Sequence, residues 1–228
     1  MLTIPKSASV TVLTGAGISV ASGLAPFRGP GGIWNDIDVE TMISAQAWRN
    51  HPDKVSGFLD RMRQAARAAE PNEAHLALAR AEAARTQGAR FDVVTQNIDG
   101  LHKRAGSENV HEIHGSIEID RCDRCRHRFP HGAGFCECGT PLRPHVVLFG
   151  EILPEDAMRA AMQAIDRCEW FVAVGTSGVV WPAASFVEEA RKAGARCINV
   201  NVEKSGNPAF HEECVGPAEN LVPLLFDV

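Results

Sequence analysis

The sequence contains no tyrosine, so any function that needs a phenol is excluded. It also contains no long basic run, and its 23 Lys and Arg residues stand against 28 Asp and Glu residues, for a formal net charge of −5. This charge balance argues against electrostatic binding to a nucleic-acid backbone. No apolar run approaches the roughly eighteen residues of a membrane helix, and the N-terminus lacks a signal-peptide pattern. We therefore expect a cytoplasmic protein without nucleic-acid or membrane partners, and a monomer is compatible with these features.

What the sequence does contain is enough apolar material for a full core. Its 228 residues are 45% hydrophobic, which suits one large domain, or one domain with a small insert. Apolar runs that end in glycine, hydroxyl or amide residues recur at residues 9–14, 91–94, 170–174 and 197–201, with helical patterns at about 154–168 and 182–194. Strands that alternate with helices predict an α/β fold with a doubly wound parallel sheet, which binds a nucleotide at the carboxyl ends of its strands.

A turn of small residues, Gly15-Ala16-Gly17-Ile18-Ser19, follows the first predicted strand. The backbone can approach a pyrophosphate closely at such a turn. The dinucleotide fingerprint is incomplete, since Val20 stands where a third glycine is expected, and a tight turn without a ligand is the alternative. The following residues, 22–32, are rich in Gly and Pro and predict a long loop able to close over a cofactor, with Phe27 excluding water and Arg28 meeting phosphate.

An alanine-rich helical pattern runs from about Val39 to Thr86 and breaks near Pro52 and Pro71. Asn72 is the predicted N-cap of its last helix. In the middle helix, four apolar residues recur at helical spacing: Val55, Phe58, Leu59 and Met62. This spacing predicts one apolar face that packs in a core.

Seven cysteines, an odd number, argue against a disulfide framework. Four of them form two close pairs, Cys122 with Cys125 and Cys136 with Cys138. Four thiolates fill the tetrahedral shell of Zn²⁺ and leave no open position, so the predicted zinc site is structural. The second pair is one residue shorter than the usual knuckle, and free or redox-active thiols are the alternative. The polar run between the pairs would hardly hold a core without the metal.

Polar residues follow the strand at residues 91–94 in the stretch Thr95-Gln96-Asn97-Ile98-Asp99. At the carboxyl end of a parallel strand, Asn97 and Asp99 should face the ligand crevice, where they offer the donor and acceptor groups that a carboxamide needs. His114 is the candidate general base, because an imidazole titrates near working pH. The alternative for any histidine is a surface or core role, and His102 and His111 are assigned to it.

Seven motifs, in their order along the chain, closely resemble those of the sirtuins. They are Gly15-Ala16-Gly17-Ile18-Ser19, Pro26-Phe27-Arg28, Thr95-Gln96-Asn97-Ile98-Asp99, His114-Gly115-Ser116, the paired cysteines, Phe149-Gly150-Glu151 and Gly175-Thr176-Ser177. The resemblance spans nearly the whole chain and implies an NAD-dependent protein-lysine deacylase of the bacterial type. It also implies a Rossmann-like NAD-binding domain at residues 1–28, 87–118 and 145–228. A smaller lobe would comprise a cofactor loop and helical module at 29–86 and a zinc-ribbon lobe at 119–144.

The resemblance also implies the roles of individual residues. It places NAD against Gly15, Ala16, Gly17, Ser19, Phe27, Arg28, Gln96, Asn97, Ile98, Asp99, Gly175, Thr176, Ser177, Asn201 and Ala218. The implied catalytic residues are His114, Asn97 and Asp99, with His114 removing a ribose hydroxyl proton after the acyl-lysine oxygen has displaced nicotinamide. The products would be nicotinamide, the deacylated lysine and an O-acyl-ADP-ribose.

Two other functions are compatible with the same NAD pocket. An ADP-ribosyltransferase or an NAD hydrolase would use NAD without removing an acyl group, and His114 is the feature that favours deacylation over both. A non-catalytic acyl-lysine reader is favoured less, since a binding module needs no histidine beside an NAD pocket.

The acyl preference is predicted from Leu59 and Met62. Sirtuins of the desuccinylase branch, which this chain resembles, carry a Tyr and an Arg three residues apart at these two positions. Arg61 and Arg63 lie on other faces of the helix and do not replace that arginine. The implied substrate residues are Leu59, Met62, Val147, Phe149, Gly150, Glu151, Leu153 and Val180. Such an apolar pocket should accept acetyl, propionyl and butyryl groups and refuse acidic ones. The competing view is that Leu59 and Met62 only pack the helical module.

Overall fold

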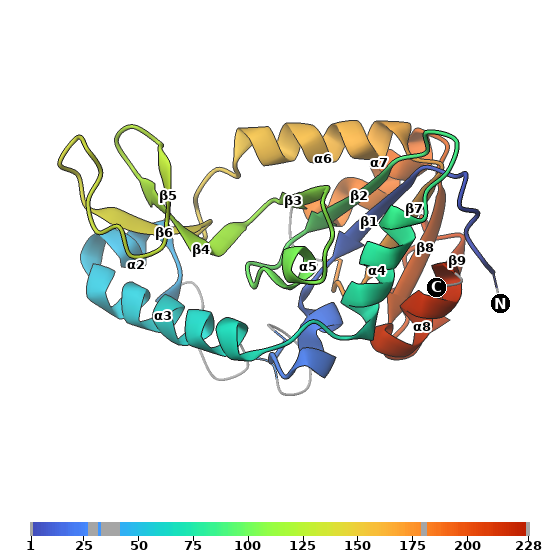
Figure 1. Ribbon diagram of the computed structural model, residues 1–228, viewed down its shortest axis with the longest axis horizontal. Helices are drawn as coiled ribbons and strands as arrows, with labels where there is room; N and C mark the ends of the chain where they lie inside the picture. Colours follow the sequence, from blue (N-terminus) through green and yellow to red (C-terminus); the bar gives the residue numbers. More distant parts are fainter. Residues whose placement is uncertain (1, 27–31, 33–41, 179–181, 227–228) are drawn as a thin grey trace.

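A computed structural model describes residues 2–26, 32, 42–178 and 182–226, which form two lobes side by side along the longest axis (Figure 1). Phe27, Arg28, Val180 and much of the predicted loop at 22–32 lie outside the described residues. Over the described ranges, every helix is too short or too polar to span a bilayer.

The larger lobe is built on a six-stranded parallel sheet with the strand order β3-β2-β1-β7-β8-β9. Its strands are β1 (Val10–Thr14), β2 (Phe91–Thr95), β3 (Val110–Glu112), β7 (Trp170–Val174), β8 (Arg196–Asn201) and β9 (Glu212–Val215). The four apolar runs are all strands, and the predicted doubly wound sheet is confirmed. The prediction missed β3 and β9, because these edge strands are short and rich in polar residues. The strand order reverses between β1 and β7, and open α/β sheets bind their ligands at such a reversal.

Helices cover both faces of this sheet. On one face lie α4 (Glu73–Ala83) and α8 (Ala218–Phe226), and on the other lie α6 (Glu155–Arg167) and α7 (Phe186–Lys192). Short helices follow the ends of β1, β2 and β7: η1 (Ala16–Ser22), α5 (Leu101–Arg104) and η3 (Ala183–Ser185). Val12 packs in the core between the sheet and helices α4 and α8. Its neighbour Leu13 packs in the core between the sheet and helices α6 and α7, as expected for a strand buried on both faces. The helices predicted at about 154–168 and 182–194 are therefore confirmed, with a 3₁₀ turn opening the second.

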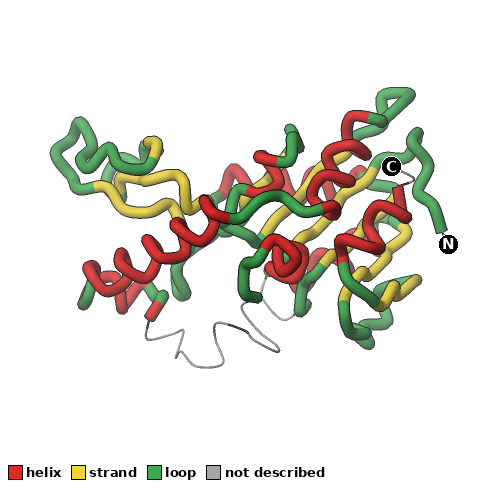
Figure 2. Tube along the Cα trace, turned by 60° about the horizontal axis from the view of Figure 1, so that its bottom comes forward, coloured by secondary structure: helices red, strands yellow, loops and turns green. Residues whose placement is uncertain are grey.

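The smaller lobe combines two helices with an antiparallel sheet. The helices are α2 (Ala45–Asn50) and α3 (Pro52–Ala68), and the sheet has the order β5-β4-β6, with β4 (Gly115–Cys122), β5 (Arg128–Pro130) and β6 (Leu142–Val146). Figure 2 shows this small sheet apart from the large one, with α3 running from the small lobe toward the large lobe. Phe58 and Leu59 of α3 pack against Ile117 and Leu148, so the predicted apolar face does lie in a core.

Two lobe boundaries differ from the prediction. Asn72 caps α4 as expected, but α4 packs against α8 in the larger lobe and is not part of the helical module. Its apolar face is mostly alanine, which permits close packing against either lobe, and periodicity alone does not identify the partner. β4 begins at Gly115, so the small sheet starts before the predicted boundary at residue 119.

Candidate active site between the two lobes

A cavity of about 850 Å³ lies where the two lobes meet. The residues that follow β1, β2, β7 and β8 form its large-lobe wall, at the predicted edge of the sheet. The predicted residues on this wall are Gly15, Ala16, Gly17, Gln96, Asn97, Ile98, His114, Gly175, Thr176, Ser177, Asn201 and Ala218. Those on the small-lobe wall are Leu59, Met62, Val147, Phe149, Gly150, Glu151 and Leu153. Residues far apart in the sequence are thus brought to one cavity.

Three glycines bring the ends of β1 and β7 into close contact. The Gly17 N–H donates to the Gly175 carbonyl at 2.9 Å. A Cβ on Gly15 or Gly17 would stand 2.7 Å from that carbonyl oxygen, and Gly175 itself has a φ of +59°. Close backbone packing therefore requires glycine at these positions. A tight turn would need these glycines even if it bound no ligand. The same lack of side chains leaves bare backbone on the cavity wall, which also fits a pyrophosphate.

Asn97 carries an unused hydrogen-bond acceptor. Its Nδ2 donates to the Gly15 carbonyl at 3.1 Å and to the Ser19 hydroxyl at 3.3 Å, whereas its buried Oδ1 accepts no hydrogen bond from the described residues. Buried polar atoms in native proteins almost always have a partner. An incoming amide N–H group would supply one, and this fits the carboxamide of NAD.

Ser19 and Asp99 lie behind Asn97 and are not on the cavity wall. The Ser19 hydroxyl donates to Asp99 Oδ2 at 2.8 Å, and the Leu101 N–H donates to Oδ1 at 2.9 Å. Burial raises the pKa of Asp99, and these hydrogen bonds oppose the rise. In this structure Asp99 holds Ser19, and Ser19 is hydrogen-bonded to Asn97.

His114 lies on the cavity wall, and a hydrogen bond fixes its tautomer. Its Nδ1 lies 3.0 Å from the Gln96 carbonyl oxygen. Because a carbonyl can only accept, Nδ1 carries the proton and Nε2 keeps its lone pair. Burial lowers the pKa of His114, and the hydrogen bond to Gln96 opposes this. A neutral imidazole on the cavity wall is able to take up a proton.

Thr176 accepts hydrogen bonds from residues at the ends of two other strands. The Gln96 side-chain amide donates to the Thr176 hydroxyl at 2.9 Å, and the Asn201 amide donates to the Thr176 carbonyl at 3.0 Å. These three residues follow or end β2, β7 and β8, so they form a polar floor at the strand ends.

The sequence analysis missed several wall residues, and one group of them consists of Val202, Glu203, Lys204, Ser205, Gly216, Pro217 and Glu219. The Glu213 carboxylate holds this region by accepting hydrogen bonds from the N–H and hydroxyl of Ser205, both at 2.8 Å. The available signal was Asn201, since the loop that follows a strand end borders the same crevice. Gly216 and Pro217 follow β9, which was not recognised as a strand.

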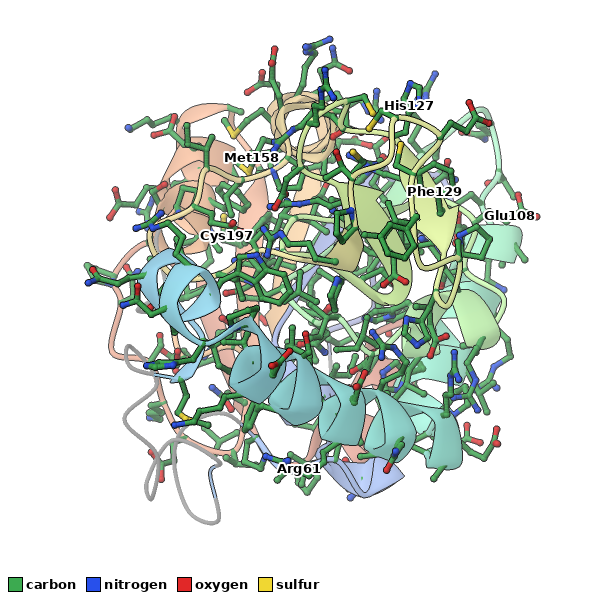
Figure 3. The ribbon with its side chains drawn as sticks, turned by 90° about the vertical axis from the view of Figure 1, so that its left-hand side faces the viewer. Arg61, Glu108, His127, Phe129, Met158 and Cys197 are labelled. Atoms are coloured by element: carbon green, nitrogen blue, oxygen red, sulfur yellow. The ribbon has the colours of Figure 1, made fainter. Side chains whose placement is uncertain are left out.

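The four paired cysteines gather at the far end of the small lobe. Their Sγ atoms all lie within 4.8 Å of one another, and the contacts of Cys125 with the other three are 3.3 Å. Tetrahedral zinc with bonds of about 2.3 Å would place the sulfur atoms about 3.8 Å apart. The observed distances, from 3.3 Å to at most 4.8 Å, lie on both sides of this value, so the arrangement is compatible with Zn²⁺ despite the short Cys136-x-Cys138 pair. In Figure 3, His127 and Phe129 mark this end of the lobe.

The small-lobe wall is apolar near α3. Leu59 is buried, half-buried Met62 lies one turn further on, and both line the cavity while also packing in the lobe core. The position of this pair is therefore compatible with a contact to substrate as well as with packing in the lobe core. Arg63 is buried and donates to the Ile117 carbonyl at 2.7 Å. The guanidinium of Arg61, which is exposed and labelled in Figure 3, lies 5.7 Å from the centroid of the Phe58 ring. Neither arginine lines the cavity, as predicted.

His102 and His111 have the structural roles assigned to them. His102 is fully enclosed and bonds the Thr14 hydroxyl at 2.9 Å, and His111 bonds the Asp92 carboxylate at 2.9 Å. Burial lowers the pKa of His102 well below its ordinary value. Neither residue lines the cavity.

Comparisons with known proteins agree with this geometry. The sequence model of the Sir2 family matches residues 15–182. NAD-dependent protein deacetylase 1 of Pyrobaculum aerophilum is 38% identical over 235 residues, which covers 98% of this chain and 91% of that protein. The NAD-dependent protein deacylase of Escherichia coli (strain K12) is 41% identical over 234 residues, which covers 94% of this chain and 79% of that protein. Among solved structures, a complex of Sir2 with a p53 peptide and NAD⁺ is similar with a TM-score of 0.80 and 31% identity, covering 95% of this chain and 91% of that chain.

Proposed function

The chain belongs to the Sir2 family and is an NAD-dependent protein deacylase, and from this premise we propose that it removes acetyl and other short apolar acyl groups from lysine, with His114 as the general base. The observation that carries the proposal is that His114 is hydrogen-bonded to both walls of one cavity. Its ring donates to Gln96 on the large-lobe side, and its carbonyl accepts from the Val147 N–H at 2.9 Å on the small-lobe side. A base at this junction reaches groups bound on either side.

We assign NAD to the large-lobe wall. The bare backbone at Gly15 and Gly175 suits the pyrophosphate, and the free Oδ1 of Asn97 suits the carboxamide of nicotinamide. Phe27, Arg28 and Ile98 are proposed contacts on the nicotinamide side, and Ala218 is proposed near the adenine. When bound, NAD supplies the ADP-ribose that takes up the acyl group.

His114 is proposed to receive a proton at Nε2 while Nδ1 stays bonded to Gln96. The lowered pKa keeps the imidazole neutral at neutral pH, which is the form that a base requires. Asn97 and Asp99 are proposed to orient the nicotinamide end, Asn97 by direct contact and Asp99 through Ser19.

The acyl group is assigned to the apolar wall of Leu59, Met62, Val147, Phe149 and Leu153. Among the described residues of that wall, none carries a positive charge. Burying a carboxylate without a partner costs several kcal/mol, and each 1.4 kcal/mol is about tenfold in kcat/KM. Acidic acyl groups should therefore be refused by about two orders of magnitude or more. Each added CH₂ of an apolar chain should gain up to ~0.8 kcal/mol until the pocket is full.

The test uses acetyl-, butyryl- and succinyl-lysine versions of one peptide, assayed with the parent and with Leu59→Tyr/Met62→Arg. We expect the parent to prefer acetyl and butyryl groups and the double variant to gain activity on succinyl-lysine. A parent that prefers succinyl-lysine, or a variant with the parent's ranking, would contradict the acyl assignment.

The same assay separates deacylation from the two NAD-using alternatives. A deacylase releases nicotinamide in step with loss of the acyl group, whereas an ADP-ribosyltransferase or NAD hydrolase releases nicotinamide and leaves the acyl group in place. We expect equal amounts of nicotinamide and deacylated peptide by mass spectrometry.

Zn²⁺, held by Cys122, Cys125, Cys136 and Cys138, is assigned a structural role because four thiolates leave no open position. A cytoplasmic location is part of the proposal, since a reducing compartment keeps these thiols available for metal. Fractionation of the cells that make the protein tests it.

A further inference from the structure

Two buried arginines lie side by side on neighbouring strands of the small-lobe sheet. Arg121 of β4 is paired in register with Arg143 of β6, and their side chains are only 7% and 2% exposed. Like charges directly opposite on a sheet destabilise it, and buried charges require partners. The pair therefore depends on acceptors close by.

Two carboxylates supply those acceptors. Asp123 Oδ1 accepts from Nε of Arg121 at 3.3 Å and from Nε of Arg143 at 3.1 Å. The Glu151 carboxylate accepts from Arg121 at 3.2 Å through both oxygens, and it also accepts from Arg143. The guanidinium of Arg143 lies over the Trp48 ring at 5.3 Å, which fixes its plane. Two cations and two anions thus form one cluster, in which the buried Nη1 of Arg143 has no hydrogen-bond partner among the described residues.

Glu151 also closes the turn that lines the cavity. Its Oε2 accepts the Leu148 N–H at 3.0 Å, and its own N–H donates to the Leu148 carbonyl at 2.9 Å. Gly150, with a φ of +84°, occupies the position of this four-residue turn that favours glycine. A single side chain therefore links the turn at Leu148–Glu151 to the arginines of the sheet.

The cluster adjoins the cysteine site. Cys122 stands between Arg121 and Asp123 in the chain, and the Cys125 N–H lies 3.4 Å from the Cys122 sulfur. The short run 121–123 thus carries one predicted metal ligand and two members of the charge cluster. The cysteine site and the groups that hold Glu151 therefore share one short backbone segment.

We propose that Glu151 is a positioning residue, held by Arg121 and Arg143, which couples the order of the cysteine site to the cavity-lining turn and makes no contact with acyl-lysine through its side chain. The inference rests on the proposed function, because it requires the turn to lie on the substrate side. It replaces the direct substrate role that the family resemblance implied for Glu151.

The central test is Glu151→Gln, which keeps the shape of the side chain and removes its charge. We expect the KM for an acetyl-lysine peptide to rise by up to about 10²-fold, since a misplacement of about 1 Å can cost an enzyme that much. NAD affinity by calorimetry and zinc content by elemental analysis should equal those of the parent. The matched control is Glu155→Gln, which removes an exposed carboxylate four residues further on. It should leave all three quantities unchanged.

Arg143→Lys is the second variant, because it keeps the charge and removes the planar fork that reaches two carboxylates. We expect the same pattern, with a smaller rise in peptide KM. Hydrogen exchange provides a readout without turnover: amides of residues 147–153 should exchange faster in both variants and in the parent after zinc is removed by a chelator. Exchange of the β2 amides should stay unchanged.

Unchanged peptide KM in both variants would overturn the proposal, as would a loss of kcat without a change in KM. Unchanged exchange at 147–153 after zinc removal would overturn the coupling to the cysteine site. If Glu151→Gln does not fold, Arg143→Lys and the exchange measurement decide. A parent that fails to deacylate contradicts the proposed function, whereas an active parent with unaffected variants contradicts only the role of Glu151.

Discussion

The two walls of the cavity are stabilised in different ways. The large-lobe wall consists mainly of backbone at the ends of buried parallel strands, where Gly15 and Gly17 pack against Gly175. The small-lobe wall rests on α3, one turn and a small antiparallel sheet. Buried ion pairs and four cysteines hold that sheet. The wall proposed to bind NAD therefore takes its order from the central fold, while the wall proposed to bind the acyl group depends on groups that can be removed one at a time.

This difference has a physical basis in the size of the cores. Strand β1 is buried on both faces, so the strand ends cannot move without opening the main sheet. In the small lobe, β5 is largely exposed and the zinc-ribbon segment has little apolar content. A metal site in such a segment contributes folding free energy directly. Substitutions in the large-lobe wall should consequently affect NAD affinity, and changes in the small lobe should affect peptide binding.

The largest effect is expected for His114→Ala, at the junction of the walls. Deacylation should fall by roughly two to four orders of magnitude, the usual contribution of a general base. NAD binding should survive, because the side-chain hydrogen bonds of Gln96 and Asn97 do not involve the imidazole. Initial rates and calorimetric NAD affinity are the measurements, with His111→Ala as the control histidine outside the cavity. A rate close to that of the parent would remove His114 from the role.

Removal of zinc should distinguish most directly between the contributions of the two walls. A strong chelator should weaken peptide binding and deacylation, by less than the loss in His114→Ala, since the small sheet loses its main constraint, while NAD affinity is largely retained. Peptide anisotropy, NAD calorimetry and elemental analysis on the same sample make the comparison. Protein that contains no zinc by elemental analysis and is fully active would refute the structural role of the metal.

Paired glycine substitutions test the opposite side. In Gly17→Ala the new Cβ would stand 2.7 Å from Gly175 atoms, and such overpacking costs typically 1–3 kcal/mol. We expect NAD affinity to weaken by about tenfold or more, with zinc content unchanged. The matched control is Gly57→Ala in α3, where nothing lies within 4 Å of the new Cβ.

In that control the helix should gain about 0.5–1 kcal/mol from the better helix former, and NAD affinity should stay the same. Thermal unfolding and calorimetry measure both effects. Equal effects of the two substitutions on NAD affinity would argue against a wall set by glycine packing.

The smallest expected effect is a shift of the acid limb of the pH profile. His114 must be neutral to act as a base, and burial holds its pKa below the ordinary value of 6.5. The neutral form therefore persists to lower pH than for a solvent-exposed histidine, and the midpoint of the acid limb of kcat/KM should lie below pH 6.5. A profile of kcat/KM against pH on acetyl-lysine peptide checks this. A midpoint above 6.5 would contradict the burial of this imidazole in the working enzyme.

Much of the fold and the site was predictable because it is encoded in short segments. The buried strands appear as apolar runs, the helices as periodic patterns, and the zinc site as two close cysteine pairs. The order of Gly15–Ser19, Thr95–Asp99, His114 and Gly175–Ser177 along the chain indicated the family and its NAD pocket. For Leu59 and Met62, helical spacing was sufficient to predict one shared apolar face, and the structure confirms it.

Other features depend on contacts between segments that are distant in the sequence, and these only the tertiary structure decided. Whether α4 packs with α3 or with α8 depends on which surfaces fit, and an alanine face suits both. The clash that makes Gly17 necessary comes from Gly175, about 160 residues further on. No sequence pattern near Glu151 indicates that its carboxylate pairs with Arg121 and Arg143. Local patterns record which face of an element is buried, whereas its partner is set by the packing of the whole chain, because burial of apolar surface is non-directional and close packing is specific.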